Sequence, residues 1–210
     1  HLFTQGMVLK DGSVMSKSKG NTVEADFITQ KYGADTARGF ILLAAPPEKE
    51  FEWDDHGVEG IFRFLNRVWR LVEQYSVRAK ERAPLSSEPD AQVSELKKHL
   101  HKTICKVTND IEKEFHFNTA LSALMEFTNR LYLIKIPEQG SDKARVEREL
   151  IDSLDTLVLL LSPFTPHICE EMWKLLGHEG SVMLEKWPGY DAALAKDEEV
   201  EIVVQVNGKA

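Results

Sequence analysis

Apolar residues recur with a helical period along most of the chain after residue 57. Spacings of three and four residues between them are typical of helices that bury one face and expose the other. Five such helices are predicted, over residues 58–82, 91–114, 117–136, 141–161 and 166–176. The pattern therefore predicts a mainly α protein whose largest part is a helix bundle.

The ends of these helices carry recognisable signals. Pro137 and Ser162-Pro163 each stop a helix, because proline cannot continue one. Ser141 or Asp142 is expected to cap the helix over 141–161. Thr165 followed by Pro166 is typical of a helix start. The bundle helices are thus expected to be separated by short connections.

Before residue 57 the elements are shorter. Residues 7–9 and 14–15 flank Asp11-Gly12, a dipeptide typical of a tight hairpin turn, so a β-hairpin is predicted over residues 2–15. A short helix over 22–32 follows, with Phe27 and Ile28 facing inward.

Gly33 stops that short helix, and a second helix is predicted over 34–45 before Pro46-Pro47. Residues 46–57 are expected to be a connecting loop. The short elements thus lead from the hairpin into the bundle.

Two other segments lack helical periodicity. Residues 83–89 are expected to be a linker, and residues 181–210 a linker that leads into a small further domain, with a strand over 200–206. The chain starts at His1 and stops just after this strand, which favours a piece of a larger polypeptide.

Composition narrows the functional classes. The 210 residues carry a net charge of −8, which argues against a nonspecific nucleic-acid binder but leaves room for a local basic face. No stretch is long and apolar enough to cross a membrane. The two cysteines, Cys105 and Cys169, lie far apart in helical contexts and fit buried thiols in a reducing cytoplasm. A zinc site is not expected, because no Cys-x-x-Cys pair is present.

The most informative segment is Val14–Asn21, which follows the hairpin turn. It combines small polar residues, two lysines and a glycine. Such a loop bends sharply and directs backbone N–H groups, hydroxyls and ammonium groups at one anion. An isolated Ser-Lys-Ser is typical of an ordinary solvated loop, but the longer run predicts an anion-binding site.

Residues Val14–Ser18 resemble the Lys-Met-Ser-Lys-Ser signature of class I aminoacyl-tRNA synthetases, with valine in place of the first lysine. The resemblance implies that Met15, Ser16, Lys17 and Ser18 bind ATP. It also implies that Lys17, the second signature lysine, is the catalytic residue that stabilises the pyrophosphate leaving group. Val14 cannot donate to phosphate, so Lys17 carries more of this role.

Two further segments resemble the leucyl, isoleucyl, valyl and methionyl branch of this family. Residues 31–38 are similar to the helices after the signature, and residues 163–173 to the hallmark of the anticodon-binding domain. Residues 1–9, 45–53, 64–71 and 205–209 favour the bacterial leucyl type. A valyl or isoleucyl enzyme is the runner-up.

By this resemblance the chain divides into four parts. Residues 1–22 end a catalytic Rossmann domain, 23–56 form a stem-contact fold, 57–180 an anticodon-binding-type helix bundle, and 181–210 a linker and the start of a small C-terminal domain. The implied substrates are ATP with Mg²⁺, leucine and tRNA(Leu). The implied parent is a cytoplasmic monomer without membrane contact. This piece holds no metal and is expected to be inactive alone, because the leucine pocket and the editing domain lie elsewhere.

Three arginines of the helix over 58–82 form a candidate tRNA surface. Arg63, Arg67 and Arg70 recur at helical spacing opposite the apolar stripe, which consists of Ile61, Phe62, Leu65, Val68, Trp69 and Val72. A row of arginines without interleaved acids invites phosphate contacts, while a solvated helix face explains it equally well.

Two alternatives to an enzyme piece remain. A noncatalytic RNA-binding module would use the bundle alone and would have no need of Lys17 and its loop. A purely structural helical protein would leave the whole signature loop unexplained.

Overall fold

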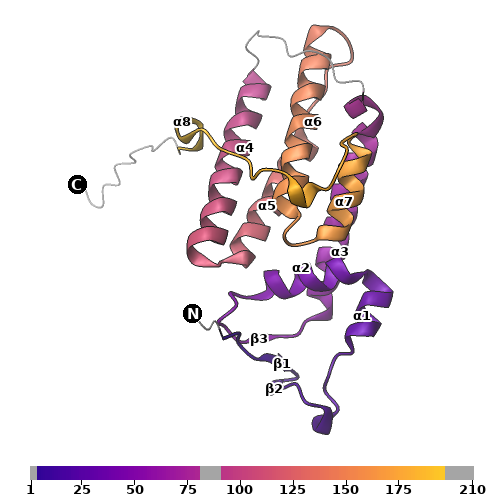
Figure 1. The fold of residues 1–210 in the computed structure, drawn as a ribbon, viewed down its shortest axis with the longest axis vertical. Coiled ribbons are helices and arrows are strands. Elements are labelled where there is room, and N and C mark those ends of the chain that lie inside the picture. Colours follow the sequence, from indigo (N-terminus) through magenta and orange to yellow (C-terminus); the bar gives the residue numbers. More distant parts are fainter. Residues whose placement is uncertain (1–3, 81–90, 197–210) are drawn as a thin grey trace, which may run out of the picture.

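The computed structural model describes residues 4–80 and 91–196. Figure 1 shows a helix bundle and, below it, a small region that contains a sheet and short helices. The protein is mainly α, as predicted from its periodicity. No helix in the described ranges is long and apolar enough to span a membrane.

The small region begins with the predicted hairpin. Strands β1 (Val8–Lys10) and β2 (Ser13–Val14) are antiparallel, with Leu9 opposite Val14. The expected loop over 46–57 is wrong in part, because β3 (Phe51–Glu52) pairs parallel with β1. This pairing joins residues about forty positions apart, so no local pattern announces it.

Two helices connect this sheet to the bundle: α1 (Ala25–Tyr32) and α2 (Ala34–Ala44). Gly33 separates them with φ = +89°, a backbone conformation that favours glycine. Ile28 is buried as predicted, but the inward placement of Phe27 is wrong, since 61% of that residue is exposed. Helix α1 has only a narrow apolar face, and Ile28 is its one buried residue.

Among the residues that the structure describes, the bundle contains five long helices. They are α3 (Asp55–Lys80), α4 (Ala91–Asn109), α5 (Phe117–Leu133), α6 (Ser141–Leu161) and α7 (Pro166–Leu175). Their apolar faces form one continuous core. The linker predicted over residues 83–89 lies outside the described residues.

Several helix ends differ from the prediction. Gly140 at φ = +95°, and neither Ser141 nor Asp142, is the N-cap residue of α6. The helix predicted over 91–114 ends at Asn109 and continues as a π-helical turn (Asp110–Glu114). The buried carboxylate of Asp110 accepts hydrogen bonds from Lys106 and from Thr119, which ties this turn to α5.

The segment after α7 crosses the bundle as an extended strap toward a short helix, α8 (Ala192–Ala195), beside α4 (Figure 1). Trp187 Nε1 donates to Thr108 Oγ1 at 2.8 Å, and the Asp191 N–H donates to His101 Nδ1 at 3.0 Å. The strap therefore covers part of the polar face of α4. The strand predicted over 200–206 lies outside the described residues.

The two cysteines differ in burial. Cys169 is fully buried, as expected, and burial strongly raises the pKa of its thiol. Cys105 is only half-buried, because it lies on the side of α4 that the strap crosses. Both are free thiols.

Candidate functional site

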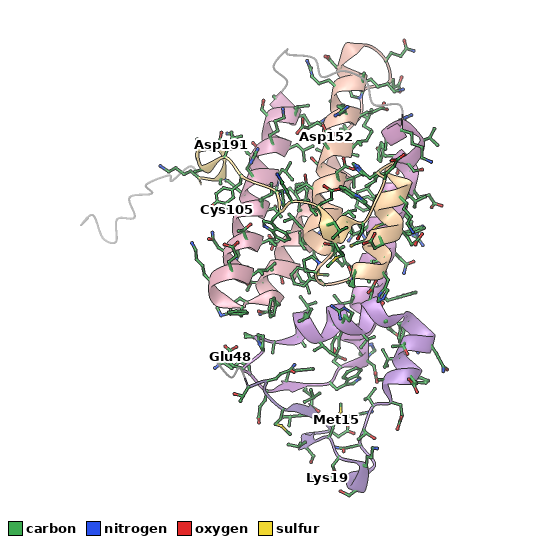
Figure 2. The ribbon with its side chains drawn as sticks, in the orientation of Figure 1. Met15, Lys19, Glu48, Cys105, Asp152 and Asp191 are labelled. Carbon is green, nitrogen blue, oxygen red and sulfur yellow. The ribbon has the colours of Figure 1, made fainter. Side chains whose placement is uncertain are left out.

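The signature loop lies at the end of the molecule farthest from the bundle. Figure 2 labels Lys19 at this end and Met15 beside the hairpin. Ser16 has an extended backbone and caps a 3₁₀ turn (Lys17–Lys19), because its Oγ accepts from the Lys19 N–H at 3.3 Å. Gly20, with φ = +68°, closes the turn.

The side chains of Lys17, Ser18 and Lys19 are exposed at this tip. Ser16 and Ser18 join through their hydroxyl oxygens at 3.1 Å. Within the described ranges neither lysine has an ion-pair partner. The turn thus presents two cations and two hydroxyls on one short segment, which suits a polyanion such as a triphosphate.

Met15 lies where the signature loop leaves the hairpin. Its N–H donates to the Val8 carbonyl oxygen at 3.2 Å, which continues the hairpin ladder, and its side chain is half-buried. That N–H is therefore already used within the hairpin. Met15 anchors the base of the loop, while Ser16, Lys17 and Ser18 form its tip.

Asn21 holds the loop in shape, a role that sequence reasoning missed. Its Oδ1 accepts from the Ser16 N–H at 2.9 Å, and its Nδ2 approaches the carbonyl oxygens of Lys10 and Ser13 at 3.3 and 3.4 Å. One side chain thereby joins both ends of the loop to the hairpin turn. Asparagine commonly bonds nearby backbone groups, so its position after Gly20 was the available signal.

We expect Asn21→Ala to loosen the loop without unfolding the bundle. The Ser16 N–H loses its acceptor, so its hydrogen–deuterium exchange should accelerate about ten-fold, which corresponds to the net value of one hydrogen bond. Amides of α5, which is remote from the loop, serve as the internal reference. Unchanged exchange at Ser16 would show that Asn21 does not hold the loop.

The predicted arginine row lies on the exposed side of α3. Arg67 is held there by α5, since its Nη2 donates to Asn129 Oδ1 at 2.9 Å and its guanidinium lies 4.8 Å from the centre of the Tyr132 ring. Arg63 has a weak ion pair with Glu59 at 4.0 Å. The structure thus places all three arginines on one face, with Arg70 and Arg63 the less constrained.

A polar joint connects the small region to the bundle. Asp35 at the start of α2 is almost fully buried, and its Oδ2 accepts from the Ile168 N–H at 2.7 Å. Its Oδ1 lies 2.9 Å from His167 Nδ1. Asp35 therefore caps the N-terminus of α7, where negative charge is favourable.

Thr165, the predicted cap residue, occupies the N-cap position, but its side chain makes no capping hydrogen bond. Arg38, one turn after Asp35, strengthens the joint. Its Nε donates to the Phe164 carbonyl oxygen at 3.3 Å. Sequence reasoning missed this joint because both halves read locally as ordinary helix starts.

No group of three or more His, Cys, Asp or Glu side chains within the described ranges is arranged to hold a metal ion. The loop and the arginine row instead offer cations and hydroxyls, which bind phosphates. Both sites therefore carry side chains that suit anionic groups such as phosphates.

Two protein-family models match the chain. Residues 93–210 match the anticodon-binding domain of tRNA ligase, and residues 1–54 match tRNA synthetases class I (I, L, M and V). The chain belongs to the family of class I tRNA ligases with an anticodon-binding domain.

Among curated proteins, the chain is similar to leucine–tRNA ligases. It is 50% identical over 210 residues to those of Geotalea daltonii and Citrifermentans bemidjiense, which covers 100% of this chain and 25% of each relative. The chain thus spans about a quarter of the length of the relatives it matches.

Solved structures agree with this fold. The ternary complex of Agrobacterium radiobacter K84 agnB2 LeuRS with tRNA and LeuAMS matches with a TM-score of 0.79 and 35% identity, over 98% of this chain and 26% of that one. Mycobacterium tuberculosis methionyl-tRNA synthetase in complex with methionyl-adenylate matches with a TM-score of 0.67 and 19% identity, over 83% and 38%. The second likeness concerns the fold alone.

Proposed function

We propose that this chain is part of a leucine–tRNA ligase, which activates leucine with ATP and transfers it to tRNA(Leu). The observation that carries the proposal is 50% identity to leucine–tRNA ligases along the whole chain. The signature loop supports it, because an exposed turn with Lys17 and two hydroxyls suits ATP phosphates. Valyl and isoleucyl enzymes are the nearest alternatives.

We further propose a division of labour along the chain. Residues 1–22 end the catalytic domain, 23–56 form the stem-contact fold, 57–180 form the tRNA-docking bundle, and 181–210 lead into a small C-terminal domain. Three features support the boundaries after residues 22 and 56: the hairpin, the joint at Asp35 and the start of α3 at Asp55. The strap after α7 supports the last.

The proposed chemistry is an in-line attack of the leucine carboxylate on the α-phosphate of ATP. The bond to the leaving pyrophosphate breaks, and negative charge grows on its oxygens. Lys17 stabilises that charge from a mobile side chain, while Ser16 and Ser18 act as supporting donors. Val14 contributes no donor, so Lys17 is the one signature cation.

We propose that Mg²⁺ arrives with ATP as part of the substrate. The arginine row Arg63, Arg67 and Arg70 would contact tRNA phosphates, which orient the nucleic acid without reading its bases. The parent would act as a monomer in the cytoplasm, where tRNA is charged for protein synthesis.

The test is leucine-dependent ATP–pyrophosphate exchange by the full-length enzyme that carries this chain, compared with isoleucine, valine and methionine. Exchange dominated by leucine is expected. Exchange dominated by another amino acid would keep the mechanism and change the specificity. Absence of exchange with all four, together with retained tRNA binding, would favour the noncatalytic RNA-binding module.

A further inference from the structure

A cleft of about 540 Å³ opens where the small region meets the bundle. It lies between the α1–α2 corner on one side and helices α3 and α7 on the other. Its walls are mainly apolar and include Tyr32, Phe62 and Trp69. Its polar groups include those of His167 and Asn66, which also line the cleft.

The aromatic wall is open to solvent at Phe62, which is 38% exposed. Phe62 belongs to the predicted apolar stripe and lies at its solvent-exposed edge. The Phe62 ring meets Tyr32 edge to face, with ring centres 5.5 Å apart. An exposed aromatic ring held by a second ring is a stacking surface for a flat π-system.

His167 supplies an oriented polar group at the rim. Its side chain is 76% exposed, and Asp35 holds it through Nδ1 at 2.9 Å. The opposite ring nitrogen, Nε2, is thus left for a ligand. Asn66 adds a second group, because its Nδ2 donates to the Phe62 carbonyl oxygen and its Oδ1 has no hydrogen-bond donor within the described ranges.

Cations border the cleft. Arg63 and Arg70 each follow a cleft residue, Phe62 and Trp69, and therefore lie about 100° further around α3. Lys31 lies on the other side, with its Nζ 4.7 Å from the centre of the Tyr32 ring, and its hydrogen bond to Tyr32 raises its pKa.

The acids at the rim are already paired. Glu59 accepts from the Tyr32 hydroxyl at 3.0 Å and pairs with Arg63, and Glu171 pairs with Lys174 at 3.0 Å. These pairs leave Arg70 without an acidic partner within the described ranges. The cleft therefore combines an aromatic surface, oriented hydrogen-bonding groups and neighbouring cations.

We propose that this cleft holds one unpaired nucleotide of the tRNA. The base stacks on Phe62 and bonds with His167 Nε2, while the flanking phosphates contact Arg63 and Arg70. Unstacked bases are recognised in this way, by aromatic stacking and hydrogen bonds at their edges. The inference rests on the proposed function, because it names where on this chain the tRNA binds.

A nucleotide fits these observations better than a peptide helix does. A helix would need an apolar groove several turns long, whereas this cleft is compact and bordered by cations. Paired RNA does not present its bases to such a cleft, so the nucleotide must be unpaired.

The test compares tRNA affinity of the full-length enzyme with Phe62→Leu and Phe62→Tyr variants, using a tRNA(Leu) transcript over a range of salt concentrations. Leucine keeps the apolar volume but removes the π-face, so affinity should fall roughly ten-fold or more, with little change in salt slope. The Phe62→Tyr variant keeps an aromatic ring, so it should retain the affinity of the unaltered enzyme for tRNA. Tyr190→Leu is the matched control, since Tyr190 is 40% exposed and lies on the strap.

A double variant tests the phosphate contacts. Arg63→Gln with Arg70→Gln should reduce the magnitude of the salt slope by about 1.5, the value expected for two phosphate contacts. Chemical footprinting of the tRNA should show one unpaired base that the unaltered enzyme protects and the Phe62→Leu variant exposes.

The outcomes separate the two proposals. If the unaltered enzyme fails to bind tRNA, the proposed function is wrong. If it binds tRNA but Phe62→Leu behaves like the Tyr190→Leu control, or if the protected base remains protected, the cleft proposal is overturned and the function stands. A thermal melt of each variant identifies misfolding. If Phe62→Leu misfolds, the tRNA affinity of Phe62→Tyr and the salt slope of the arginine variant decide whether the cleft binds the nucleotide.

Discussion

Replacing Lys17 with alanine should lower the rate of leucine activation by about 100-fold or more, while leucine binding changes little. The reason is that charge grows on the leaving pyrophosphate only as the reaction proceeds, and removal of one preorganised donor typically costs this much. Val14 cannot compensate, because it carries no donor. ATP–pyrophosphate exchange by the full-length enzyme that carries this chain measures the effect.

Lys19→Ala is the matched control, since Lys19 lies on the same 3₁₀ turn and is also exposed. Its effect should be several-fold smaller, because Lys19 does not match the second signature lysine. An unchanged rate for Lys17→Ala would contradict the catalytic role of the loop. Equal losses for both lysines would show that the turn acts only through its total charge.

Replacing Asp35 with alanine should destabilise the protein by about 2 to 3 kcal/mol. The change leaves the Ile168 N–H without its acceptor at the buried N-terminus of α7 and leaves His167 unheld. Loss of a buried charged hydrogen-bond acceptor has a cost of this size. Urea unfolding of the chain, followed by far-ultraviolet circular dichroism, gives the free energy.

Two variants make this measurement specific. Asp35→Asn keeps an oxygen that accepts from Ile168, so its loss should be clearly smaller. Glu171 lies on α7, the helix that Asp35 caps, and Glu171→Ala removes an exposed ion pair with Lys174, which should change stability by less than about 1 kcal/mol. Equal stability of Asp35→Ala and Glu171→Ala would show that the joint does not hold the two parts together.

Local patterns predicted most helices well, for a physical reason. Each bundle helix buries one stripe, and the period of that stripe is set by residues three or four positions apart. Their ends were predicted less well. Gly140 starts α6 because only its backbone conformation fits there, and Asp110 supports a π-helical turn through contacts with α5.

The candidate sites also combine features that a local pattern predicts with features that depend on contacts between elements. Lys17 was predicted from the resemblance of a contiguous run to the synthetase signature, and the arginine row from its helical spacing. The structure then showed that α5 holds Arg67 in place, that Met15 belongs to the hairpin ladder, and that Asn21 joins the ends of the loop. Each of these findings depends on which acceptor a side chain meets, which no spacing specifies.

The sequence by itself determined the helix bundle, the hairpin and the signature loop, because hydrophobic period, turn residues and a short polar motif are local properties. Only the tertiary structure decided how α2 meets α7. The hydrogen bond from Ile168 to Asp35 joins residues 133 positions apart, and the same meeting of helices opens the cleft beside Phe62. Such contacts arise from the packing of separate helices, so their partners are known only once the chain has folded.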